Sequence, residues 1–231
     1  MKESKNWSKF LIEFISVFIA VVFAFALNNW NDNRKDNNAE TKILHEISNG
    51  LTKDLDDIAL NILGHKEGII ACKHWRKVIN NTEFSQDSVL INYLNLTRDF
   101  VSIQNKAGYE TLKSKGLELI KNDSLRLEII SLYEYDFKTL EKLEETYSEM
   151  QFQKSYYKEL NRIISPFLVF DNKGYITSLK RPIKVSEIDK NIFSAYLWKI
   201  EMNRNFILHY YSEMEKKTRK LIIIIESELK Q

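Results

Sequence analysis

Hydrophobic positions form one continuous run near the N-terminus. After it they recur three or four residues apart over long stretches. The run is Phe10–Leu27, FLIEFISVFIAVVFAFAL, in which Glu13 is the single acid. As a helix it would extend roughly 27 Å, close to the thickness of bilayer hydrocarbon. Trp7 and Trp30 lie just outside its two ends, where aromatic rings anchor at the level of the lipid headgroups. The pattern predicts a transmembrane helix over residues 10–30, with residues 1–9 as its flank.

The same run resembles the hydrophobic part of a secretory signal, because Lys2, Lys5 and Lys9 precede it. It is longer than that part usually is. It also ends in Asn28–Asp32 rather than in a small-residue cleavage site, for which Ala24–Ala26 is the nearest match. We therefore expect a span that is retained, with the lipid bilayer as its first partner.

One face of this predicted helix differs from the others. Glu13, Ser16, Ala20 and Ala24 recur at spacings of three and four, which places them on one side. Small residues at such spacing let two membrane helices approach closely, and a carboxyl inside the span is costly when it faces lipid. We interpret this face as a possible seam between copies of the chain. The alternative is that Ala is common in membrane helices and that Glu13 simply reaches the interface.

The chain after the span predicts long helices. Residues 31–38, rich in Asn and Asp, are expected to be an interfacial linker, and residues 39–231 a helical domain outside the membrane. Apolar residues then recur at helical spacing, and Gly64 and Gly68 are the points at which this helix could be interrupted. The positions of this period are Leu44, Ile47, Leu51, Leu55, Ile58, Ile62, Ile69, Cys72, Trp75 and Ile79.

Start and stop signals divide the rest of the domain. A short helix is expected over 88–94, and another ends at Lys115 because Gly116 supplies a positive φ. Asn122 or Asp123 caps a long helix, whose period runs from residue 125 to residue 164 and which Pro166 ends.

Two elements complete the predicted domain. The short apolar runs on either side of Asp171–Gly174 predict a small β-hairpin near residues 167–177. Ser186 begins the last helix, whose expected core positions are Ile188, Ile192, Leu197, Ile200, Ile207, Tyr211, Met214, Leu221, Ile225 and Leu229.

Composition agrees with this all-α class, an N-terminal transmembrane helix followed by an antiparallel bundle of long helices. The 231 residues include only 6 Gly and 2 Pro, which favours few, long elements with short connections. The formal net charge is +2 and no basic block is present, so nucleic acid is not an expected partner.

Two segments carry a resemblance to a known family. The first is the span with its exit, Asn28-Asn29-Trp30, followed by a charged helix. The second is Tyr109–Gly116 with Leu119–Asp123 and Leu132–Tyr135 after it. Together they resemble a family of uncharacterised bacterial membrane proteins with one N-terminal span and a helical domain. The resemblance implies this architecture and no catalytic residues.

Motifs for catalysis or cofactor binding were not found in the sequence. His45, His65, His74 and His209 lack metal-site spacing, and Cys72 reads as a small buried core thiol. The adjacent acids Asp56-Asp57 and Glu144-Glu145 diverge on a helix and are expected on solvated faces. Nucleophile elbows and phosphate loops need closely spaced glycines, which the chain lacks. We expect no enzyme activity, no cofactor and no metal.

The resulting hypothesis is a membrane-anchored helical protein that acts by assembly or partner binding, as a scaffold or sensor. Its homo-oligomer contacts would use the span and the helix after it, alongside an unknown protein partner. The alternatives are a subunit of an oligomeric or pore-forming assembly, and an anchored enzyme with a site built from dispersed helical residues. The resemblance implies a bacterial inner membrane location. Lys2, Lys5 and Lys9 before the span equal in number Arg34, Lys35 and Lys42 after it, but they lie closer to the span, which favours the N-terminus in the cytoplasm and the domain outside.

Overall fold

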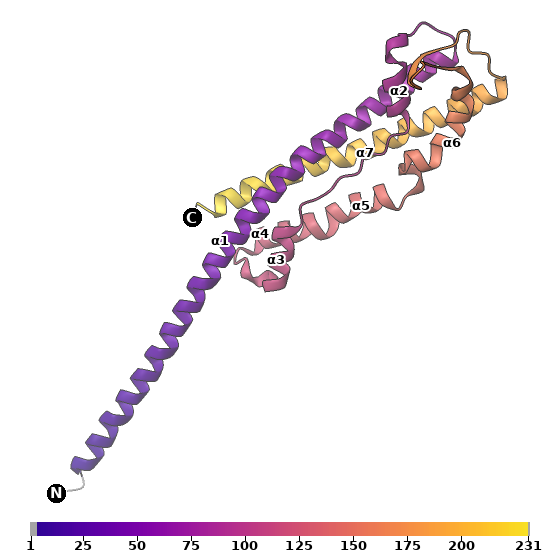
Figure 1. Ribbon diagram of the computed structural model, residues 1–231. Helices are drawn as coiled ribbons and strands as arrows, with labels where there is room; N and C mark the ends of the chain where they lie inside the picture. The colour runs from indigo at the N-terminus through magenta and orange to yellow at the C-terminus, as the bar shows by residue number, and fades with distance from the viewer. Residues whose placement is uncertain (1–3, 231) are drawn as a thin grey trace.

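The computed structural model describes residues 4–230, and its regular secondary structure is helical apart from one small hairpin (Figure 1). Helix α1 (Ser4–Ile79) and helix α7 (Glu187–Glu228) lie antiparallel along much of their length. A third, broken rod packs beside them and comprises α4 (Asp123–Ile130), the π-helical turn η3 (Ser131–Asp136), α5 (Phe137–Glu145) and α6 (Phe152–Ile164). The all-α class is confirmed. Residues 1–3 of the predicted N-terminal flank, Lys2 among them, lie outside the described residues.

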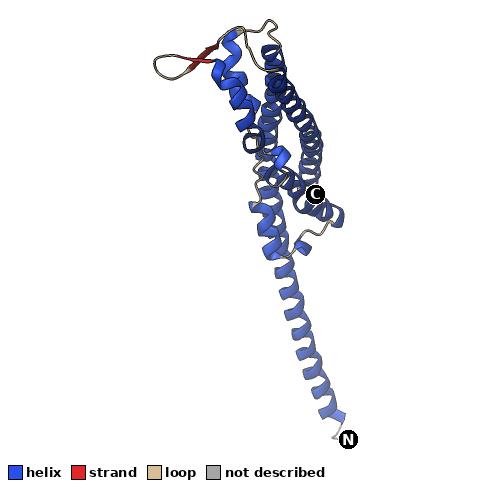
Figure 2. Cartoon of the chain, turned by 90° about the vertical axis from the view of Figure 1, so that its right-hand side faces the viewer, coloured by secondary structure: helices blue, strands red, loops and turns tan. Residues whose placement is uncertain are grey.

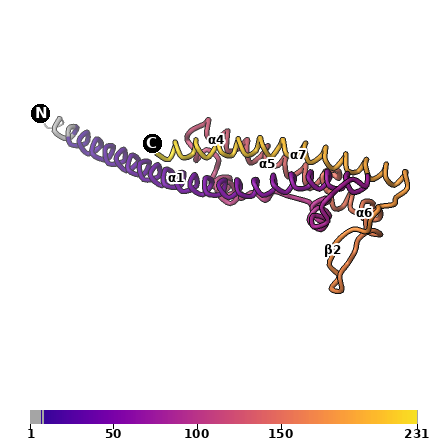
Figure 3. The backbone as a smooth tube through the Cα atoms, turned by 90° about the horizontal axis from the view of Figure 1, so that it is seen from above, coloured from indigo at the N-terminus to yellow at the C-terminus, as the bar shows by residue number. Residues whose placement is uncertain are grey.

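Helix α1 is unbroken from the apolar run into the bundle, so the expected linker over residues 31–38 is instead helical. Asn and Asp are only modestly unfavourable in a helix, and here they make contacts within it. Asn28 Nδ2 donates to Asp32 Oδ2 at 3.1 Å, and Lys35 pairs with Asp32 at 3.5 Å. The apolar run and the bundle are therefore parts of one continuous rod, which projects far beyond the other helices (Figure 3).

Short elements connect α1 to the third rod. They are η1 (Gln86–Ser88), α2 (Val89–Leu96), α3 (Ala107–Lys115) and η2 (Leu117–Leu119). Gly116 ends α3 with a φ of +105°, which a side chain would disfavour. Asn122 caps α4, because its Oδ1 accepts the N–H of Leu125 at 3.1 Å. Both boundaries were predicted from the sequence.

The single long helix predicted over residues 125–164 is wrong, because the chain leaves helical geometry between α5 and α6. Tyr147 is extended, and the turn η4 (Ser148–Met150) follows it. The break is stabilised by the rest of the fold, since Glu149 O accepts hydrogen bonds from Asn203 Nδ2 at 3.0 Å and from Tyr156 OH at 3.1 Å. Contacts with α7 thus decide this break.

The hairpin consists of β1 (Leu168–Phe170) and β2 (Ile176–Leu179), antiparallel, with Leu168 opposite Leu179 (Figure 2). It follows η5 (Ser165–Phe167), where Pro166 ends α6 as predicted. Helix α7 then begins after Ser186, whose Oγ accepts the N–H of Asp189 at 3.0 Å.

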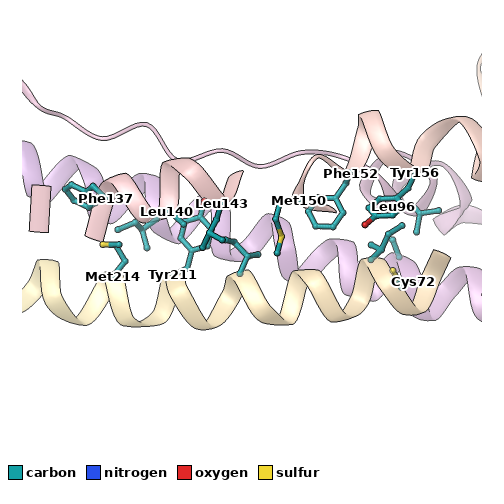
Figure 4. Packing of buried hydrophobic residues seen from close by; sticks show 14 of the residues in the cluster. Cys72, Leu96, Phe137, Leu140, Leu143, Met150, Phe152, Tyr156, Tyr211 and Met214 are labelled. Carbon is teal, nitrogen blue, oxygen red and sulfur yellow. The ribbon is translucent and has the colours of Figure 1, made fainter. Parts of the chain in front are cut away.

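The core runs between the three rods, and buried side chains from all of them meet there (Figure 4). Most predicted core positions are buried. Leu55, Ile62 and Ile69 of α1 are only partly buried. Ile188 and Ile192 of α7 are exposed, and Phe193 takes the core position expected of Ile192.

Candidate functional site

The N-terminal part of α1 exposes its whole apolar run. Every side chain from Phe10 to Leu27 is exposed, and the segment is long and apolar enough to cross a membrane. Soluble proteins rarely expose a contiguous apolar surface of this extent, since contact with water is costly. This run is the first candidate functional surface.

The helix places Glu13, Ser16, Ala20 and Ala24 along one side of the run, and all four are exposed. Ser16 Oγ donates to Ile12 O at 2.7 Å, so this hydroxyl is satisfied within its own helix. A contact between copies through this face stays a prediction.

The expected interfacial anchors lie at the two ends of the run. Trp7 and Trp30 are both exposed. The guanidinium of Arg34 lies 5.3 Å from the ring of Trp30, a cation–π contact one turn along the helix. A Trp with an adjacent Arg is typical of the boundary between lipid and water.

A second unusual feature is an arginine in the middle of the bundle. Arg204 of α7 is fully buried, and its Nη2 donates to Asn95 O at 3.3 Å, Leu96 O at 3.2 Å and Arg98 O at 3.0 Å. The carbonyls of Asn95 and Leu96 are the last two of α2, where a helix carries partial negative charge, and Arg98 follows just after it. The guanidinium also lies over the ring of Phe152 at 4.1 Å. Arg204 thus joins α7 to the end of α2.

His65 of α1 completes the surroundings of this arginine. Its Nδ1 lies 3.2 Å from Arg204 Nη1, and because arginine only donates, Nδ1 is the acceptor. Burial, followed by the charge of Arg204, lowers the pKa of His65 to about 3. Burial lowers the pKa of Arg204 to about 10, so it keeps its charge at neutral pH. The pair is one cation and one neutral ring.

An extended segment, residues 97–106, runs along the bundle between α2 and α3, and carboxylates accept its N–H groups. Asp54 Oδ1 accepts from Asn105 N at 2.7 Å, Asp57 Oδ2 from Ile103 N at 3.1 Å, and Glu144 Oε2 from Ser102 N at 3.0 Å. Such bonds supply the partners that a strand would obtain from a neighbouring strand. Burial is the main cause that raises the pKa of Asp54 to about 6 and that of Glu144 to about 7.

The expectation that both acid pairs lie on solvated faces is therefore half wrong. The members of each pair diverge as predicted, and Asp56 and Glu145 are exposed. Glu144, however, is buried, and Asp57 is partly buried beneath the extended segment.

The burial of Arg204 was not predicted, although the sequence carries a signal for it. Arg204 is a charged residue four positions after Ile200 and three before Ile207, within the apolar period of α7. That spacing directs the guanidinium into the core.

The remaining reactive residues do not converge. Cys72 is fully buried, and burial raises the pKa of its thiol to about 12, as expected of an inert core cysteine. His45 and His209 are exposed, while His65 and His74 are buried. Among residues 4–230, no three His, Cys, Asp or Glu side chains are grouped so as to hold a metal ion.

No curated protein and no solved structure matches this chain. A sequence model of a family of unknown function (DUF6090) matches residues 13–172, which include most of the apolar run, the buried carboxylates and the third rod. The match ends within the hairpin, so α7 with its Arg204 lies beyond it. The protein belongs to this family of unknown function, DUF6090.

Proposed function

We propose that this protein is a single-span membrane protein that holds a helical bundle at the membrane and acts by assembly or partner binding. The observation that carries the proposal is the continuity of α1. Its N-terminal part is the exposed apolar run, and its C-terminal part is a helix of the bundle. A bilayer would cover that run, and the unbroken helix would fix the bundle as an upright rod. We place the protein in a bacterial inner membrane, as the resemblance implies. The N-terminus would lie in the cytoplasm and the bundle on the opposite side of the membrane, because of the lysines close before the run.

Assembly of copies would use one face of α1. A helix repeats its face after about ten turns, or 36 residues, so Ala24 and Leu60 lie on the same side. On that side Leu60 and Leu63 are 67% and 55% exposed, and Ile70 two turns further on is also exposed. Copies anchored in one membrane stand parallel, which would let this face meet its counterpart in a second copy.

Disulfide trapping in native membranes tests the assembly. We expect Ala24→Cys and Leu60→Cys each to give a covalent dimer under mild oxidation. Val22→Cys, on the opposite side of the run, and Leu90→Cys, an exposed leucine of α2, are the matched controls. Native Cys72 is buried and should not interfere. Equal trapping at all four positions, or at none, would refute the shared face.

Membrane attachment and orientation need a separate measurement. Glu83→Cys places a thiol at an exposed position four residues after Ile79, the end of α1 that lies away from the apolar run. We expect the protein to stay in the membrane fraction after a carbonate wash. A membrane-impermeant maleimide should label Glu83→Cys in cells in which only the outer membrane has been permeabilised. Protein found in the soluble fraction would contradict the span, and labelling only after inner-membrane lysis would reverse the orientation.

A further inference from the structure

The first half of α7 exposes an apolar face to solvent. Trp198, Met202 and Phe206 follow one another at four-residue spacing, so they lie along one side of the helix. They are 60%, 49% and 46% exposed. Ala195 and Ile188, seven and fourteen residues before Met202, continue this side and are also exposed. We call these five residues the outward face of α7, which extends over about 28 Å of helix.

The five residues of the outward face are uncharged, and most charges near them are balanced within the chain. The charged residues between Ile188 and Phe206 are Asp189, Lys190, Lys199, Glu201 and Arg204. Asp189, Lys199 and Glu201 pair with other elements of the bundle, and Arg204 is buried. Lys190 lies about 120° round the helix from Met202. A charged partner would therefore find little to pair with on this face.

The second half of α7 has the usual composition of a helix exterior. Glu213 and Lys220 follow Phe206 by seven and fourteen residues, and Lys216 follows Met202 by fourteen, so all three lie on the same side as the outward face. Lys216 pairs with Glu213 at 2.7 Å. Trp, Met and Phe without charge are instead typical of the centre of a protein interface. The change in composition along one helix thus marks the first half as a contact surface.

The protein's own bilayer does not cover this face. Arg204, two residues from both Met202 and Phe206, packs at Gly68 of α1. Gly68 follows Leu27 by 41 residues, or about 62 Å of helix. That distance exceeds the thickness of a bilayer, so the lipid around the apolar run cannot reach the outward face.

We propose that the outward face of α7 packs against the same face of a second copy of this chain. The inference rests on the proposed membrane anchoring, because copies held in one membrane stand parallel. A two-fold axis along the rods then sets each residue of the face beside its own counterpart. In such a contact every charge would meet a like charge, which is costly, so an uncharged face suits it.

The area of this contact fits copies that are already anchored. A buried aromatic side chain removes roughly 150–250 Å² from water, so Trp198 and Phe206 of two copies, each about half exposed, would together bury about 400 Å². Ile188, Ala195 and Met202 would bring the total to about 1,000 Å², the size of a small specific interface. Anchored copies have already lost much of their freedom to translate and rotate, so a contact of this size can hold them.

This contact is separate from the one proposed for α1. Arg76, which pairs with Glu201 of α7, lies about 160° round α1 from Leu60. Leu60 therefore points away from α7, and the two contacts use different sides of the bundle. Either contact can fail without the other.

Disulfide trapping of the full-length chain in native membranes tests the outward face. Phe206→Cys should give a covalent dimer under mild oxidation. Lys158→Cys, at an exposed position of α6, is the matched control and should stay monomeric. Helix α6 lies beside the same part of α7, since the rings of Tyr156 and Tyr196 are 5.9 Å apart.

A charge placed within the face gives a second measurement. Adding Met202→Glu to Phe206→Cys should lower the yield of dimer about fivefold, because two like charges would meet. Met202→Leu should preserve the yield. Met202 is exposed, so neither substitution should change the melting temperature. If Met202→Glu does unfold the chain, the comparison of Phe206→Cys with Lys158→Cys still decides.

Four results would overturn the proposal. They are no dimer of Phe206→Cys, equal trapping of Lys158→Cys, full trapping in a folded Met202→Glu variant, and a cross-linked product that mass spectrometry identifies as a different protein. Trapping at Leu60→Cys reports the α1 contact alone and should be unaffected by Met202→Glu. Trapping at Phe206→Cys without trapping at Leu60→Cys would refute only the α1 contact.

Discussion

Arg204 occupies the space that a side chain at Gly68 would need. A Cβ placed on Gly68 would lie 2.2 Å from Arg204 Nε and 2.3 Å from its Cζ. The guanidinium cannot move away freely, because three carbonyls and His65 hold it. Gly68, at which the sequence suggested that α1 could be interrupted, is therefore the position where the buried guanidinium of α7 packs against α1.

The first prediction concerns this glycine. Gly68→Ala should lower the free energy of unfolding by about 1–3 kcal/mol, because the methyl group overpacks a fixed side chain. Gly50→Ala in the same helix is the control. The nearest atoms to its Cβ would belong to the side chain of Asn105, at 3.3 Å, and Ala is the better helix former by about 1 kcal/mol. Thermal unfolding of the two variants should separate them, and similar melting temperatures would contradict the close approach.

A second prediction concerns the arginine itself. Arg204→Met leaves the carbonyls of Asn95, Leu96 and Arg98 without this donor, at a cost of about 3 kcal/mol in unfolding free energy. Arg219→Met removes an exposed arginine of α7 that pairs with Glu215, and should change stability by less than about 1 kcal/mol. Chemical denaturation measures both. Hydrogen exchange at the end of α2 should rise in Arg204→Met alone, and equal exchange would argue against the capping role.

The third prediction is a pH dependence caused by Glu144. Because its pKa is raised to about 7 in the fold, the folded state binds a proton that the unfolded state releases near pH 4.5. Its contribution to stability is therefore present below about pH 4.5 and is lost as the pH rises through 7. Relative to the wild type, Glu144→Gln should gain roughly 3 kcal/mol between pH 4.5 and pH 8. Denaturation curves at the two pH values, compared with Glu145→Gln at the exposed neighbour, give the measurement.

The fourth prediction concerns Cys72. Its thiol is buried and its pKa is raised to about 12, so a maleimide should not react with the folded protein at pH 7.5. Full labelling should follow unfolding in guanidinium chloride. The Glu83→Cys variant should take up one label per chain when folded. Rapid labelling of the wild type would place Cys72 at the surface.

Local signals in the sequence predicted most helix ends. Gly116, Asn122, Pro166 and Ser186 each act on neighbouring backbone groups, through a positive φ, a side-chain cap or a missing N–H. Such signals need no knowledge of distant residues. The polar segment 31–38 misled the prediction, because weak propensities do not break a helix whose neighbours on both sides are strongly helical.

Other features depend on residues that are far apart in the chain. The break after Thr146 is held by Asn203 of α7, and the burial of Glu144 depends on the N–H of Ser102 and the hydroxyl of Tyr211. A depression beside the last turns of α1 joins that helix to Ser85 and Ser88 in the same way. A pattern along one helix shows which side is apolar, but not which polar group a distant segment will need.

The sequence alone therefore determined the apolar run, the helical class and most element boundaries, since composition and short-range hydrogen bonding govern them. Tertiary structure alone decided which carbonyls Arg204 meets, that Glu144 is buried, and that Lys73 and Lys77 share a depression with His74. The physical reason is that buried polar groups are stable only when partners from other elements satisfy them, and the fold chooses those partners.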